Sequence, residues 1–386
     1  MRLSVSFLLQ FLFIQISVIK PGFKSNCDVL FNCIKMLNRD LSDAINRLRM
    51  PLAFLVVCVH ADFTKKFSYA GKQVNCAYDI GYHIVNFISH TLADIAVPLF
   101  YLISGMLCFY SIRRHGYRSL LEKKSTTLLL PYIIWNLIFF ITFSLDKDYT
   151  VYEFIKGFWF LPRGGITGVL TQPWDGPLWF LRDLMVIFLL TPVIIFILRK
   201  MGFLFICTVY FIYATKTISW YIFPGFSITC LLMFSLGIYL QMIDCNWFDK
   251  IKKRWLELLV ITIVCMVITY LYSVIEKDTT SLFYNLLHST YILLGGSAAL
   301  AVVGISKKAY FMEKWGRNTF IVFASHSLFL TYVIKVIMLP FGYDINNIET
   351  VFIYLFSCLV TYAISFVLGE IISRNAWLIK LLTGGR

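Results

Sequence analysis

The amino-acid sequence predicts an all-α, polytopic membrane protein with about ten transmembrane helices. Of its 386 residues, 59% are hydrophobic and 15% are charged, whereas soluble globular chains have about 45–50% apolar and about 25% charged residues. Because one water-soluble core cannot bury this excess of apolar side chains, a cytosolic enzyme, a disordered protein and a secreted disulfide scaffold are excluded. A spanning helix needs about 20 apolar residues, so the hydrophobic content is enough for about ten such helices.

Ten apolar segments follow one another after the first forty residues, separated by loops with charges or turn residues. They lie at residues 44–63, 84–110, 126–145, 177–198, 202–219, 224–243, 256–275, 283–304, 318–339 and 350–373. The longest connection, residues 146–176, is rich in glycine and proline. No fixed-period repeat or low-complexity tract is found. The sequence therefore predicts one membrane domain at 44–373, an N-terminal extension at 1–43 and a cytoplasmic tail at 374–386.

The distribution of positive charge predicts how these helices are oriented. The formal net charge is +14 at pH 7, which in a membrane protein is typical of cytoplasmic loops that obey the positive-inside rule rather than of nucleic-acid binding. With the residues before the first segment inside, the inside loops hold 24 Lys and Arg and the outside loops hold eight. We therefore expect both ends of the ten-helix body to face the cytoplasm, and no nucleic-acid partner.

Residues 3–19 form a further apolar run for which four interpretations are open. It can be the apolar part of a signal peptide, an eleventh span or an interfacial helix. Alternatively, Met36 is the true start and residues 1–35 are a mis-called extension. The charge rule is already satisfied by a body that starts at Met36.

Two ionisable residues in the first segment are the first candidates for chemistry, because such residues are costly inside a bilayer. Arg49 and His60 are separated by about three helical turns, so they share one face of the helix, roughly 16 Å apart along its axis. Arg49 is expected at the cytoplasmic interface and His60 near mid-membrane. Histidine can accept and return a proton near neutral pH. The structural alternative is a core histidine that is hydrogen-bonded to a neighbouring helix.

In the first helix, an arginine and a histidine are separated by ten residues. This pattern and the motifs that follow it resemble those of acyltransferase family 3, the polytopic membrane O-acyltransferases. The further motifs, in the expected order, are VPLFYLISG at 97–105, LPY at 130–132 with Trp135, PLWFLRDL at 177–184, and GRNTF at 316–320 with His326. One position departs from the family pattern, because Thr127 stands where many members have the second arginine of an Arg-x-x-Arg motif. Either Arg118, Lys123 and Lys124 replace that arginine, or the donor binds differently.

The resemblance implies that the protein moves an acyl group, usually acetyl, from cytoplasmic acyl-CoA to a hydroxyl of a cell-surface glycan or its lipid-linked precursor. It also implies a bacterial inner membrane. Acyl-CoA, such as acetyl-CoA, would be a donor substrate rather than a permanently bound cofactor. Its phosphates would bind cations of the cytoplasmic side, and the planar guanidinium of arginine suits phosphate. The candidate cations are Arg49, Arg118, Lys123 and Lys124.

His60 is the expected catalytic group, with Arg49 as its partner on the donor side. His60 would either pass the proton of the acceptor hydroxyl to the departing thiolate or form a transient acyl-histidine. The sequence leaves both routes open. No metal is expected, since the ten cysteines include no CxxC pair.

Four residues are candidates for the acceptor side, and each has a structural alternative. Trp179 can stack on a sugar ring or simply anchor the membrane interface. Arg182 and Asp183 are adjacent in the sequence, so they are expected on different sides of their helix. Either residue can bind the acceptor, or the two can pair structurally. His326 lies inside the ninth segment, where a structural use is the alternative.

Two further expectations concern the second segment. His90 and Asp94 are one turn apart and are expected to satisfy each other, and Ser104-Gly105 is expected to allow close helix packing. A transporter or flippase without covalent chemistry is the alternative function. It would be expected to show repeat-related halves, which the sequence does not display.

Overall fold

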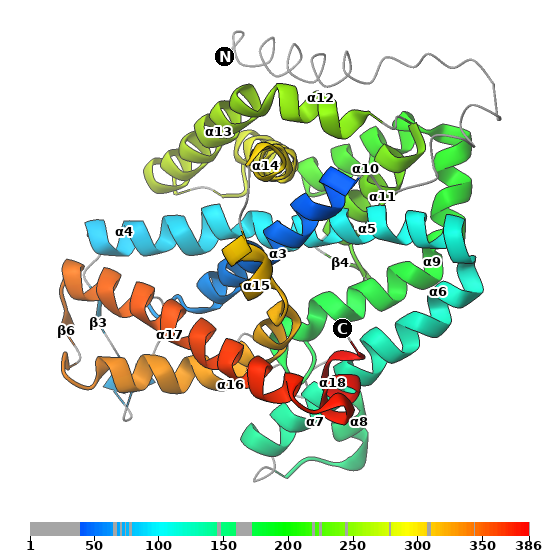
Figure 1. Cartoon of the computed structure of the whole chain (residues 1–386). Coiled ribbons are helices and arrows are strands. Elements are labelled where there is room, and N and C mark those ends of the chain that lie inside the picture. Colours follow the sequence, from blue (N-terminus) through cyan, green and yellow to red (C-terminus); the bar gives the residue numbers. More distant parts are fainter. Residues whose placement is uncertain are drawn as a thin grey trace.

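The computed structural model describes residues 39–64, 68–69, 72–73, 75–76, 79–144, 148–159, 172–217, 221–223, 226–243, 246–277, 279–306, 310–342 and 344–385. Helices dominate this part of the chain, which confirms the predicted all-α class (Figure 1). The interpretations of residues 3–19 and of a start at Met36 lie outside the described residues.

Within the described ranges, seven helical segments are long and apolar enough to cross a membrane, which supports an integral membrane protein. They are α4–η1–η2–α5 (Ile80–His115), α6–η3–α7 (Tyr117–Phe143), η5–α9 (Gly176–Met201), α13 (Trp255–Ile275), α14 (Leu282–Ile305), α16 (Thr319–Met338) and α17 (Asn347–Ser373).

The other three apolar segments also form helices, but they do not have the length or composition of a simple span. Helix α3 (Arg39–His60) carries five charged residues, and α10 (Phe203–Thr215) has 13 residues. Helix α11 (Ile228–Ile243) has 16 residues and is followed at an angle of 104° by α12 (Trp247–Lys253). All ten apolar segments are therefore helical, whereas ten membrane crossings and their sidedness stay predictions.

Local sequence signals explain where several of these helices begin and end. Helix α17 begins with a capping box, in which the Asn346 side chain accepts from the Glu349 N–H and the Glu349 side chain accepts from the Asn346 N–H. Helix α5 (Ala96–His115) ends at Gly116, whose φ of 83° suits glycine. These signals satisfy backbone groups that a helix end otherwise leaves unpaired.

The long connection between α7 (Leu130–Phe143) and α9 (Trp179–Met201) is more ordered than a simple outer loop. It contains α8 (Val151–Gly157), and at its end Trp174 and Asp175 are buried. The few strands are short: β1 (Ser68–Tyr69) with β2 (Lys72–Gln73), β3 (Asn75–Cys76) with β6 (Asp344–Ile345), and β4 (Tyr221–Phe223) with β5 (Phe226–Ser227). The β3–β6 pair joins the connection after α3 to the one after α16.

Helix α3 occupies the middle of the bundle and places its residues against many neighbours (Figure 1). It packs against α5, α14, α16, α17 and the short α15 (Tyr310–Gly316). Its Leu48, Leu52 and Val56 belong to the main hydrophobic core. A charged helix is stable there because its apolar face is covered on several sides.

Helices α5 and α11 approach each other through glycine, as Ser104-Gly105 predicted. A Cβ at Gly105 would lie 2.1 Å from the carbonyl oxygen of Phe234, and one at Gly237 would lie 2.2 Å from that of Leu102. Such distances leave no room for a side chain, so the expectation of close packing is confirmed.

The segment predicted as a cytoplasmic tail contains a docked helix, α18 (Ala376–Thr383). The indole nitrogen of Trp135 on α7 donates to the carbonyl oxygen of Leu382 at 2.9 Å. A Cβ at Gly384 would lie 2.3 Å from the Cα of Thr127. The residue that departs from the Arg-x-x-Arg pattern therefore packs against the end of the chain.

Candidate active site

The structure brings two histidines together that are far apart in the sequence. His60 is the last residue of α3, and its ring centroid lies 5.3 Å from that of His326 on α16. The His60 side chain is exposed, whereas His326 is completely buried. An exposed imidazole beside a buried one places a reactive group where a substrate can reach it.

The hydrogen bonds of His326 define which of its nitrogens is available. Nδ1 donates to the carbonyl oxygen of Phe323 at 2.7 Å. Because Nδ1 carries the proton, Nε2 of the neutral ring has a lone pair. Within the described part of the chain Nε2 has no hydrogen-bond partner. A buried acceptor without a partner is costly, so the ring beside His60 can accept a hydrogen bond from a bound group.

Arg49 lies where the sequence placed it, three turns before His60 in the same continuous helix. Its side chain is exposed, and α15 packs beside it, since a Cβ at Gly316 would be 3.7 Å from the Cβ of Arg49. Arg317, which follows Gly316, lines a small cavity of about 40 Å³ together with Asn318 and Ser373. The cavity lies between α16, α17 and α18. Arg317 is thus a further cation close to the α15–α3 contact. It belongs to the GRNTF motif, but the sequence analysis did not select it as a donor-binding residue.

The other three predicted donor-binding cations lie together on α6 (Tyr117–Lys124). Arg118 pairs with Glu122 at 3.1 Å on the surface, and Lys123 is exposed. The Lys124 ammonium lies 4.6 Å from the centre of the Phe188 ring on α9. The predicted donor cations are thus divided between α3, which carries Arg49, and α6.

Arg182 and Asp183, which are adjacent on α9, pair with each other, as their structural alternative predicted. Their side chains form an ion pair of 3.5 Å, and both are completely buried. Asp183 Oδ2 also accepts from the Ser227 N–H at 3.1 Å and from the Tyr101 hydroxyl at 3.3 Å. The flexible arginine folds back towards its neighbour because a buried charge needs a partner. The hydrogen bonds of Asp183 favour its structural interpretation.

Trp179 and Arg182 lie at the beginning of α9, close to aromatic neighbours. Trp179 is half-buried, with its ring centroid 6.5 Å from that of Tyr101. Arg182 donates to the carbonyl oxygen of Trp159 at 2.6 Å. His326 is the one acceptor-side candidate that the described contacts place against His60.

Asp175 is a buried carboxylate beside this centre that the sequence analysis did not single out. Its Oδ1 accepts from the Ser327 hydroxyl at 2.7 Å, and its N–H donates to Asn136 Oδ1 at 3.0 Å. Ser327 directly follows His326. The available signal was an aspartate just before the PLWFLRDL motif, but only the fold places it against α16.

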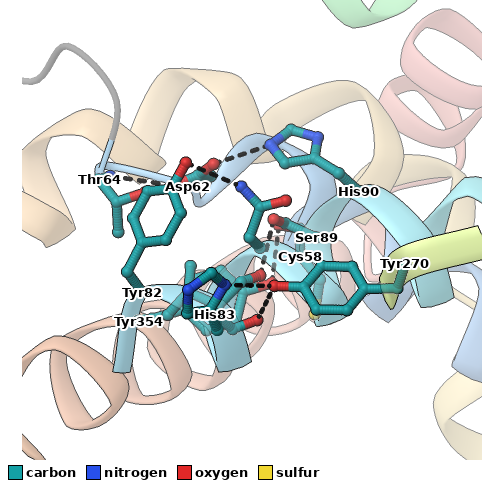
Figure 2. A network of polar contacts seen from close by, with 11 residues as sticks. Cys58, Asp62, Thr64, Tyr82, His83, Ser89, His90, Tyr270 and Tyr354 are labelled. Atoms are coloured by element: carbon teal, nitrogen blue, oxygen red, sulfur yellow. Dashed lines mark hydrogen bonds and ion pairs between the residues drawn. The ribbon is translucent and has the colours of Figure 1, made fainter. Parts of the chain in front are cut away.

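A histidine–carboxylate pair is formed by His90 and Asp62, which follows His60 by two residues in the chain (Figure 2). His90 Nε2 is 2.7 Å from Asp62 Oδ2. The predicted pairing of His90 with Asp94 is therefore wrong, and Asp94 instead faces His288 at 3.5 Å. The reason is η1 (Ile88–Leu92), a π-helical turn that changes the angular spacing along the segment.

The fold and these residues define an integral membrane protein with a histidine-centred site between its helices. The chain belongs to acyltransferase family 3: the family model described as "Acyltransferase domain" matches residues 42–370. This match confirms the resemblance that the motifs indicated.

A curated relative is the succinoglycan biosynthesis protein ExoH of Rhizobium meliloti (strain 1021). It is 29% identical over 176 residues, which are 42% of this chain and 45% of the relative. The match thus spans less than half the length of that relative. No solved structure matches the chain.

Proposed function

We propose that this acyltransferase moves an acyl group, usually acetyl, from acyl-CoA to a hydroxyl of a cell-surface polysaccharide or its lipid-linked precursor. The observation that carries the proposal is the pair of imidazoles of His60 and His326, 5.3 Å apart on helices of the bundle. The family supports the transfer, and the relative ExoH, by its name, supports a polysaccharide acceptor. The organism of that relative supports a bacterial inner membrane.

In the proposed reaction His60 acts as the general base. It takes the proton of the acceptor hydroxyl while the oxygen attacks the thioester carbonyl carbon. A new C–O ester bond forms, the C–S bond breaks, and the imidazolium returns the proton to the CoA thiolate. The proton balance closes within the site, so no further reactant is needed.

Arg49 and Arg317 would bind the phosphates of the donor at the other end of the same helix. Arg49 is about 16 Å from His60 along α3, a distance that the extended pantetheine arm of CoA can cover. The cations of α6 would add long-range attraction for the polyanionic donor. Exposed cations near the α15–α3 contact support this arrangement.

A purified preparation of the full chain in detergent tests the proposal directly. With acetyl-CoA, the release of free CoA is measured by a thiol reagent, and ester-linked acetyl is measured on glycans of cells with and without the gene. We expect CoA release and a loss of glycan esters in the deletion strain. Unchanged esters together with no thioester consumption would overturn the function.

A further inference from the structure

A row of polar side chains runs along one side of α4 (Ile80–Phe87) into η1, within the candidate span Ile80–His115. Its members Tyr82, Asn86 and His90 are spaced four residues apart. The Asn86 amide nitrogen donates to the Tyr82 hydroxyl at 3.2 Å, and His90 bonds Asp62 at 2.7 Å (Figure 2). Three polar residues in line on a spanning helix are not explained by helix packing alone.

The row lies beside the candidate catalytic histidine. Asp62 is two residues after His60, and α3 packs against η1, the π-helical turn that carries His90. The His90 side chain is 39% exposed although it belongs to a spanning segment. Since ionisable residues in such segments face protein or an aqueous space rather than lipid, we expect the exposed part of the His90 ring to face water.

The hydrogen bonds of Asp62 hold this pair in one orientation. Oδ1 accepts from the Thr64 N–H at 2.9 Å and from the Thr64 hydroxyl at 2.6 Å, and the Asp62 side chain is only 5% exposed. A carboxylate only accepts, so His90 Nε2 is the donor, and Nδ1 of the neutral ring has the lone pair. The exposed ring thus has a hydrogen-bond acceptor fixed in place by Asp62.

We propose that Asp62, His90, Asn86 and Tyr82 form the acceptor subsite and bind the hydroxyl groups of a sugar ring, placing one of them at His60. This inference rests on the proposed function and adds the location of its acceptor. A sugar ring presents hydroxyl groups that donate and accept hydrogen bonds, and an apolar C–H face. Imidazole, amide and phenol groups can bond the hydroxyls, and an aromatic ring can pack on the C–H face. The row has no excess of cations, so it suits a neutral sugar better than a phosphate.

The buried pair on α9 is less suited to this task. Asp183 already accepts from Ser227 and Tyr101 and is completely closed off. The row on α4 and η1, in contrast, has an exposed imidazole that bonds Asp62, two residues after His60. The structure therefore favours α4 and η1, rather than Arg182 and Asp183, for contact with the acceptor.

Two variants separate acceptor binding from donor binding. His90→Gln removes the imidazole, and Asn86→Leu removes the amide with little change in size. The matched control is His83→Gln on the same helix, whose ring bonds the Tyr270 hydroxyl of α13 at 3.0 Å instead. Each full-length variant is expressed in cells that lack the native gene, and glycan esters, membrane abundance and acetyl-CoA affinity of the purified protein are measured.

We expect glycan esters to fall at least tenfold in His90→Gln and Asn86→Leu, with acetyl-CoA affinity within twofold of wild type and His83→Gln unchanged. The inference is overturned if both variants reach wild-type abundance and acylate glycans within twofold, or if donor affinity falls in parallel. Should His90→Gln not accumulate, Asn86→Leu decides the question. Failure of the proposed function is distinct, because wild-type protein would then neither consume acetyl-CoA nor change glycan esters.

Discussion

The Ser327 hydroxyl donates a hydrogen bond of 2.7 Å to Asp175 Oδ1, which ties α16 to the segment that leads into α9. Ser327 follows His326, and Asp175 precedes the motif that contains Trp179 and Arg182. This contact therefore fixes the position of the buried histidine relative to the beginning of α9.

We expect Asp175→Ala to lower the stability of the protein by about 1–3 kcal/mol, because it leaves the half-buried Ser327 hydroxyl without its acceptor. The melting temperature in detergent measures the loss. Asp175→Asn keeps an acceptor oxygen and is the control, with a smaller decrease expected. A melting temperature of Asp175→Ala equal to that of wild type would show that the contact does not stabilise the fold.

We expect His60→Ala to reduce acyl transfer by about 100-fold or more, since general acid–base catalysis contributes roughly 10²–10⁴-fold. The amount of folded protein in the membrane should not change, because the His60 side chain is exposed. The measurement is ester-linked acyl on cellular glycans. His115→Ala, at the exposed end of α5, is the control, and near-normal acylation by His60→Ala would exclude the catalytic assignment.

Arg49 is expected to bind the donor rather than the acceptor. Arg49→Lys keeps the charge but loses the planar fork, so acyl-CoA affinity should fall by about tenfold, and Arg49→Ala should lower it further. Calorimetry with acetyl-CoA measures both. Arg199→Lys, exposed in the last turn of α9, should bind as wild type does. Equal affinity in all three variants and wild type would refute the role of Arg49.

The contact between α5 and α11 predicts a strong effect of a single methyl group. In Gly105→Ala the new Cβ would meet the Phe234 carbonyl oxygen at 2.1 Å, so the helices must separate at a cost of about 1–3 kcal/mol or more. Thermal unfolding in detergent measures this cost.

Gly296 on α14 is the matched control for this substitution. A Cβ there would meet only side-chain atoms at 3.5 Å or more. Gly296→Ala should therefore be tolerated, and alanine also favours the helix over glycine. If Gly105→Ala and Gly296→Ala unfold at the same temperature, close packing at Gly105 is not important for stability.

Hydrophobic content and charge determined much of this protein from the sequence alone. Runs of apolar residues specify helices wherever backbone groups must be satisfied within the segment, so each of the ten apolar segments is helical. The three-turn spacing of Arg49 and His60 follows from helix geometry. The motifs identified the family because their residues and order are properties of the sequence itself.

Only the tertiary structure decided which of these residues meet. His326 lies beside His60 because α3 and α16 pack together, and no local spacing encodes a contact between distant helices. Asp175 is buried because the end of a long connection packs against α16. Arg182 bonds Asp183 because a long, flexible side chain in a buried position turns towards the nearest opposite charge. His90 meets Asp62 rather than Asp94 because a π-helical turn changes the direction of side chains in a way that regular helical spacing cannot predict.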